Sequence, residues 1–135
     1  MLTEERNTPE VAGELASFYV AVETKIFAGG LVALDSDGYA VPMSTATGLK
    51  AVGRAEATAD NSTGLAGAKS VVVKPGIFRW ANSADADLIT RPDLYADCYG
   101  VDDQTVAKTS GTGTRSVAGK IVAVDATGVW VMTRP

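Results

Sequence analysis

The stretch LVALDSDGYAVP at residues 31–42 places two apolar runs around a polar four-residue segment. Aspartate and serine accept local backbone hydrogen bonds, and glycine tolerates a positive φ, so Asp-Ser-Asp-Gly is a turn sequence. Apolar and β-branched runs on both sides of such a turn are typical of a β-hairpin. We therefore predict strands at 31–34 and 39–42, joined by a turn at 35–38.

The same alternation of short apolar runs and turn residues continues on both sides of this hairpin. Valine is twice as frequent as leucine, which favours strands over helices. Further strands are expected at 18–22, 49–57, 70–74, 77–80, 98–101, 105–108, 117–124 and 129–132. A type II turn is expected at Pro75-Gly76, an exposed loop at 59–69, a loop or a single helical turn at 82–94, and a flexible loop at 109–115. We see no internal repeat.

These patterns predict an all-β fold, a small single-domain β-barrel or β-sandwich of short antiparallel strands. The domain is expected to cover residues 15–135 of the 135-residue chain. Residues 1–14 are the most polar segment, with four glutamates, one arginine, a proline and a glycine. We predict that this segment is an extended, flexible N-terminal arm.

Charge and composition exclude several classes of partner. The chain carries 12 basic and 16 acidic residues, a net charge of −4, and its cations are scattered, so we expect no nucleic-acid binding. The longest nearly apolar stretch, residues 27–34, is too short to span a membrane, and no partner membrane is expected. The acidic N-terminus does not resemble a signal peptide, and the single Cys98 fits a reducing compartment. We therefore expect synthesis in the cytoplasm of the producing cell.

Histidine is absent, which removes the commonest general base and metal ligand and lowers the expectation of catalysis. Two aspartate pairs, Asp85 with Asp87 and Asp102 with Asp103, are the candidates for carboxylate-based hydrolysis. Both pairs lie in turn-like sequence, where aspartate is favoured for its own backbone hydrogen bonds. We interpret them as turn formers and predict no catalytic residues.

No cofactor or metal site is predicted either. Asp35 and Asp37 begin like a calcium loop, but Tyr39 and Ala46 occupy the positions where further oxygen ligands are needed. The glycine-rich stretches 64–67 and 111–113 lack phosphate-loop spacing, and Cys98 is expected to be a buried, unreactive thiol. The large aromatic side chains are expected to anchor the core, some of them alternatively between subunits: Phe78, Trp80, Tyr95, Tyr99 and Trp130.

Most of the chain beyond the arm, residues 25–133, resembles the small decoration proteins, or structural cement proteins, of tailed-phage capsids. The resemblance is carried by patterns of glycine, turn and β-branched residues in these segments: FAGGLVAL (27–34), YAVP (39–42), VGRAE (52–56), DNSTG (60–64), VKPGIFRW (73–80), CYGVDDQTVA (98–107), AGKIV (118–122) and GVWV (128–131).

The resemblance implies a compact, often trimeric β-protein without catalytic residues that binds and reinforces the outer surface of an icosahedral head. It implies the major capsid protein as partner and the virion surface as location, after synthesis in the bacterial host. It also gives the N-terminal arm a role in capsid binding, and residues 18–22 have the β-propensity to add a strand to a neighbouring sheet. The residues expected to contact the capsid are Glu4, Glu5, Arg6, Phe18, Tyr19 and Val20.

Two other functions remain open from the residues. One is another virion component, such as a head-tail connector or a tail-tube subunit, because such proteins also use small β-barrels. The other is a small hydrolase built on the aspartate pairs.

Overall fold

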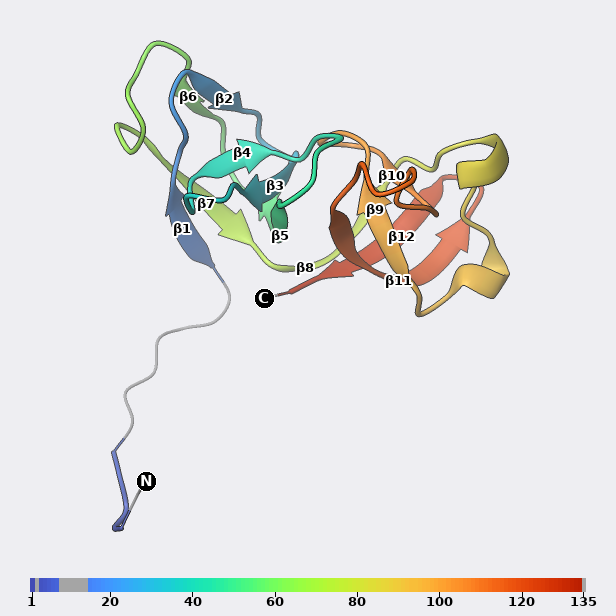
Figure 1. Ribbon diagram of the computed structural model, residues 1–135, viewed down its shortest axis with the longest axis horizontal. Helices are drawn as coiled ribbons and strands as arrows, with labels where there is room; N and C mark the ends of the chain where they lie inside the picture. Colours follow the sequence, from blue (N-terminus) through green and yellow to red (C-terminus); the bar gives the residue numbers. More distant parts are fainter. Residues whose placement is uncertain (2, 8–14, 135) are drawn as a thin grey trace.

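A computed structural model describes residues 1, 3–7 and 15–134, and its regular secondary structure consists mainly of strands (Figure 1). The prediction of a flexible arm over residues 1–14 falls largely on residues 8–14, which lie outside the described residues. The elements are β1 (Ala16–Tyr19), β2 (Thr24–Ile26), β3 (Leu31–Leu34), β4 (Ala40–Pro42), β5 (Lys50–Ala55), β6 (Ala59–Asn61), β7 (Ser70–Lys74), β8 (Gly76–Trp80), η1 (Asp85–Asp87), η2 (Arg91–Asp93), β9 (Asp97–Gly100), β10 (Val106–Ala107), β11 (Val117–Asp125) and β12 (Gly128–Thr133).

The strands form three antiparallel sheets, which confirms the all-β prediction. The first five-stranded sheet has the order β1-β7-β5-β3-β4, and the second has the order β10-β9-β11-β12-β8. A two-stranded sheet, β2-β6, lies on the side of the first sheet (Figure 1). None of the sheets closes into a barrel over the described ranges. The fold is therefore consistent with a small β-sandwich or barrel-like domain without a closed barrel.

The two larger sheets have the same topology, which the sequence, having no evident internal repeat, did not indicate. In each sheet the order in space is third, second, fourth, fifth and first strand, counted along the chain. In each sheet a single parallel bridge also brings the two edges together, between Val20 and Ala40 in one and between Ala81 and Thr105 in the other. The chain therefore contains two units of the same architecture, although its residues do not read as a repeat.

The pairing register repeats as well. Val32 of β3 lies opposite Gly53 of β5, and Cys98 of β9 lies opposite Gly119 of β11. In both pairs of strands the register shifts immediately afterwards, leaving one extra residue on the longer strand. A β-carbon at either glycine would lie within 2.4 Å of a neighbouring strand's carbonyl oxygen. The bulge and its glycine are thus shared features of the two units.

Two clusters of buried side chains form the core, and one of them joins the two units. The central core joins both large sheets, with Leu31 and Met43 of the first unit packed among Ile121, Val129 and Val131 of the second. The Leu31 N–H also donates to the Asp103 carbonyl across the units, at 2.8 Å.

The second cluster, which we call the first-sheet core, lies within the first unit and includes residues of β2 and β6. It contains Val20, Ile26, Val32, Ala40, Ala55, Ala59, Val71 and Val73.

The predicted hairpins are confirmed. In the turn at 35–38, the Asp35 carboxylate accepts hydrogen bonds from the Asp37 and Tyr39 N–H groups, and Gly38 has a φ of +84°. β9 pairs with β10, and β11 pairs with β12 through Asp125 opposite Gly128. These hairpins are specified by residues close in sequence, because turn chemistry is local.

The type II turn predicted at Pro75-Gly76 is wrong. β7 belongs to the first sheet and β8 to the second, so the chain continues from one unit into the other at this point. Gly76 has a φ of +157°, far from the value near +80° that a type II turn requires. Sequence alone reads Pro-Gly as a reversal because it does not report to which sheet each neighbouring strand belongs.

The exposed loop predicted at 59–69 is also partly wrong. Its first three residues form β6 and pair with β2. Asn61 is buried, and its side-chain amide donates to the carbonyls of Ala21 and Leu65 at 2.8 and 2.9 Å. A polar residue placed to satisfy buried backbone groups looks like a loop residue in sequence.

The aromatic residues divide between core and surface. Trp80 is buried, and its ring meets that of Phe78 edge-on with centroids 6.3 Å apart. Tyr99 and Trp130 are half-buried. Tyr95 is 73% exposed, so its predicted place in the core is wrong. Its backbone N–H donates to the Ile121 carbonyl, and its ring lies at the surface.

Candidate partner-binding site

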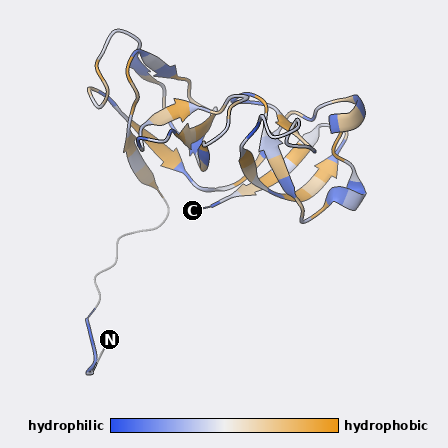
Figure 2. Cartoon of the chain, viewed as in Figure 1, coloured by the Kyte–Doolittle hydropathy of each residue, from blue (hydrophilic) through white to orange (hydrophobic). Residues whose placement is uncertain are grey.

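The predicted partner-binding residues lie on two separate parts of the chain. Glu4, Glu5 and Arg6 are exposed, and Figure 2 shows their segment as hydrophilic and away from the sheets. Phe18 and Tyr19 lie on β1, Phe18 half-buried and Tyr19 64% exposed. The structure therefore brings the residues of β1 together, and it places the first three outside the β-domain.

Val20 is removed from the set of contact residues. Its side chain is 0% exposed and packs in the first-sheet core, so no partner surface reaches it. The sequence prediction treated residues 18–22 as one available strand. Alternation along that strand turns Val20 inward and Tyr19 outward.

β1 is an edge strand, but it is already paired along one side. Its residues 16–19 lie opposite residues 70–73 of β7, so the strand belongs to its own sheet and is not a free arm. Along residues 16–19 it pairs with no second strand within the described ranges, although the next residue, Val20, bridges to Ala40 of β4. An edge strand of this kind presents N–H and C=O groups on which a further strand can pair.

An apolar groove of about 430 Å³ lies beside β1. Its lining combines the edge strand with residues of β3, β5 and the connection between the two units, and Arg134 lies at its margin. We call this surface the β1 groove, and its lining residues are Ala16, Phe18, Leu34, Lys50, Ala51, Val52, Pro75 and Arg134. Apolar residues in a surface groove are the kind of feature that marks a protein-binding surface.

Sequence reasoning missed most of the groove. Val52 is the extra residue of the bulge in β5, and Pro75 lies in the connection between the two units. The apolar-polar alternation of a strand therefore marks neither position. The available signal was an apolar residue beside a glycine in a strand, which indicates a bulge. That signal locates Val52 but not the groove, because the groove needs both units.

The aspartate pairs are engaged in loop structure. Asp102 accepts a hydrogen bond from the Gln104 N–H at 2.9 Å, as expected for a turn. Asp85 and Asp87 lie in η1, and Asp87 is paired with Arg115 at 3.1 Å. Hydrogen bonds from the Thr109 hydroxyl and the Arg115 guanidinium hold the pKa of the Asp87 carboxyl below its usual range. That direction is opposite to the raised pKa of a carboxylic general acid.

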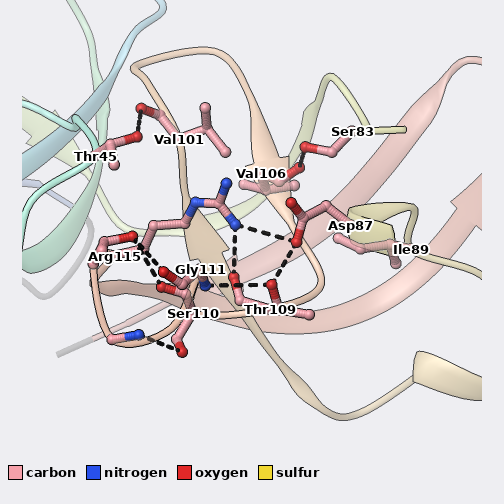
Figure 3. Close-up of polar contacts among 12 residues, drawn as sticks. Thr45, Ser83, Asp87, Ile89, Val101, Val106, Thr109, Ser110, Gly111 and Arg115 are labelled. Carbon is pink, nitrogen blue, oxygen red and sulfur yellow. Dashed lines mark hydrogen bonds and ion pairs between the residues drawn. The ribbon is translucent and has the colours of Figure 1, made fainter. Parts of the chain in front are cut away.

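The same contacts organise residues 109–115, which the sequence predicted to be a flexible connector. Arg115 donates to the Asp87 carboxylate and to the Thr109 carbonyl at 3.1 and 3.0 Å (Figure 3). The N–H groups of Thr114 and Arg115 both donate to the Ser110 carbonyl. The stretch is a hydrogen-bonded loop attached to η1, because Arg115 supplies the long-range partner that composition does not indicate.

Cys98 is buried, as predicted. Burial, together with the neighbouring Asp97 carboxylate, raises the pKa of its thiol to about 12, so the thiol stays protonated near neutrality. The Asp35 carboxylate accepts the hydrogen bonds of the hairpin turn, as described above. Over the described ranges, no group of three or more acidic or cysteine side chains is placed to hold a metal ion.

The candidate site therefore consists of an edge strand and the apolar groove beside it. Among the described residues no helix is long and apolar enough to cross a membrane. Comparison of the chain with family models, with curated proteins and with solved structures gave no match.

Proposed function

We propose that this chain is a non-enzymatic decoration protein of a phage or prophage head, which binds the outer surface of the assembled capsid and stabilises it. The observation that carries the proposal is the β1 groove beside an unpaired strand edge. The resemblance of residues 25–133 to capsid cement proteins supports the identity of the partner, the major capsid protein. The virion surface is then the working location.

The β1 groove supplies the two kinds of interaction that such docking needs. Backbone groups on the open edge of β1 accept a strand of the capsid protein, giving directional hydrogen bonds. The adjoining apolar surface contributes about 25 cal/mol for each Å² that the contact removes from water. The free energy of one such contact is modest. Firm attachment therefore comes from many copies docked on one shell and from association of the copies with one another, which we propose to be as trimers.

A carboxylate placed in the β1 groove is expected to weaken capsid binding. Ala16→Glu adds bulk and a charge at the groove without removing core atoms, and a docked apolar surface would have to desolvate that charge, which is costly. We expect the affinity for empty heads to fall at least about tenfold, measured by co-sedimentation of the full-length protein with heads that lack it.

Ala66→Glu is the matched control, because Ala66 is exposed in the loop after β6. Both variants are first compared by circular dichroism and thermal unfolding. Equal binding by the two variants would show that the capsid does not use this groove. The same sedimentation gives the copy number, since a high number supports decoration and a low number favours a head-tail connector.

Removal of residues 1–14 is expected to leave the β-domain folded and to weaken attachment. The described part of this segment, including Glu4, Glu5 and Arg6, is exposed, and β1 begins only at Ala16. We expect an unchanged unfolding temperature and fewer copies bound per head. If the truncated chain decorates heads as fully as the intact chain, the segment has no role in attachment.

A further inference from the structure

A second groove, of about 470 Å³, runs between the two units and differs chemically from the β1 groove. It combines three cationic side chains with three aromatic rings and contains no acidic lining residue. We call it the cationic groove, and its lining residues are Gly29, Arg54, Lys74, Ile77, Phe78, Arg79, Trp80 and Trp130. In a chain of net charge −4, this is a local concentration of positive charge.

Two of the three cations are held over aromatic rings. The Arg54 guanidinium lies 4.5 Å from the centre of the Phe78 ring, and that of Arg79 lies 5.8 Å from the centre of the Trp130 ring. Such stacking fixes the direction of a long side chain. Arg79 donates one N–H to the Thr127 hydroxyl at 3.3 Å, and its other N–H groups can donate to a carboxylate.

Only one of the three cations has an acidic partner. Arg54 pairs with Glu56 at 2.9 Å. Among the described residues, neither Lys74 nor Arg79 has a carboxylate within ion-pair distance. Two cations therefore lie in the groove with no carboxylate partner there, and an acidic peptide segment is the complementary occupant.

We propose that the cationic groove binds the acidic N-terminal segment of a second copy of this chain, with Glu4 and Glu5 facing Lys74 and Arg79. Glu4 and Glu5 are exposed, and neither makes a hydrogen bond or ion pair within the described ranges. The chain between Glu5 and β1 spans up to about 36 Å when extended, enough to reach a neighbouring molecule of this size.

This contact explains how copies associate on the head, and in that respect it rests on the proposed function. A segment that leaves one molecule and enters a different surface of the next is a heterologous contact. Heterologous contacts close into rings when the rotation between copies allows it, and a trimer is the smallest ring that is not a simple pair. Glu4 and Glu5 are thereby assigned to a second copy and not to the capsid protein.

The proposal is tested by the mass of the full-length protein in sedimentation equilibrium. We expect the intact chain to self-associate, and the association to weaken as salt is added. Glu4→Lys with Glu5→Lys, or Lys74→Glu with Arg79→Glu, is expected to weaken association at least about tenfold. Lys69→Glu with Lys25→Glu is the matched control, because it makes the same change of charge outside the groove, and it is expected to leave association within about threefold of the intact chain.

The chain that carries all four exchanges separates charge pairing from a loss of folding. Its segment is basic and its groove acidic, so the complementarity is restored and association is expected to return to within about threefold of the intact chain. A quadruple variant as weak as either double variant would overturn the proposal. So would an intact chain that stays monomeric, or a charge control that weakens association as much as the groove variants.

Binding to empty heads is measured on the same variants. If association is unaffected by the exchanges but heads are still decorated, this inference fails and the proposed function stands. If neither the intact chain nor any variant binds heads, the proposed function fails. The sedimentation-equilibrium result still tests the cationic groove in that case.

Discussion

Gly53→Ala is expected to destabilise the protein by about 3 kcal/mol or more. A β-carbon at Gly53 would lie 2.3 Å from the Lys74 carbonyl oxygen and 2.7 Å from its carbonyl carbon. Both atoms belong to the backbone of β7, so they cannot rotate away as a side chain does. The φ of +139° adds strain for any residue with a β-carbon.

Gly38→Ala separates the two causes. Gly38 also has a positive φ, of +84°, but its β-carbon would meet no atom within 4 Å. The expected loss is therefore only the conformational cost, about 1 kcal/mol. Urea unfolding followed by circular dichroism measures both variants. Equal losses at the two positions would show that the strands do not approach closely at Gly53.

Gly119 extends the same prediction to the second unit. Its β-carbon would lie 2.4 Å from the Met132 carbonyl oxygen, again a backbone atom. Because Gly53 and Gly119 occupy equivalent bulges, Gly119→Ala is expected to cost as much as Gly53→Ala. Similar losses of stability at the two positions are expected because the two sheets have the same topology and the same bulge.

Leu31→Ala is expected to cost about 3 kcal/mol and to lower the stability of both units together. Leu31 is 1% exposed and belongs to β3 of the first unit, but its side chain packs in the central core against β11 and β12. Truncation removes packing that both sheets share. A single cooperative transition is therefore expected, as for a single domain of residues 15–135.

Two probes make the Leu31 result decisive. Both tryptophans, Trp80 and Trp130, lie in the second unit and report its unfolding by fluorescence, whereas circular dichroism reports all strands. We expect both signals to shift by the same amount. Leu65→Ala is the control, because Leu65 is 79% exposed, and its cost is expected to stay within about 0.5 kcal/mol. A fluorescence transition that did not move would mean that the units unfold separately.

We propose a different binding partner for each of the two grooves. The β1 groove is apolar and borders an open strand edge, so it suits a strand of the capsid protein. The cationic groove is polar and aromatic, so it suits an acidic segment. Contacts between copies raise the effective concentration of the remaining contacts with the shell, and weak individual contacts then give firm attachment.

The candidate site was only partly predictable from the residues. Tyr19 was identified by the β-propensity of its run, and its exposure agrees with a surface role. Val20 in the same run is buried, because neighbouring residues of a strand point to opposite faces. The sequence predicted no cationic site, because Arg54, Lys74 and Arg79 are scattered along the chain. They lie together only where β5, β7 and β8 meet.

By itself, the sequence determined the strand content and the hairpins at 31–42 and 117–132. Turn residues and apolar alternation act over a few residues, so the information is present where the structure forms. Tertiary structure alone decided that Pro75-Gly76 passes between sheets, that the two units share one topology, and that two grooves lie around their junction. Those outcomes depend on which distant strands pair and on which faces bury together. That choice minimises the free energy of the whole chain, and no local pattern of residues specifies it.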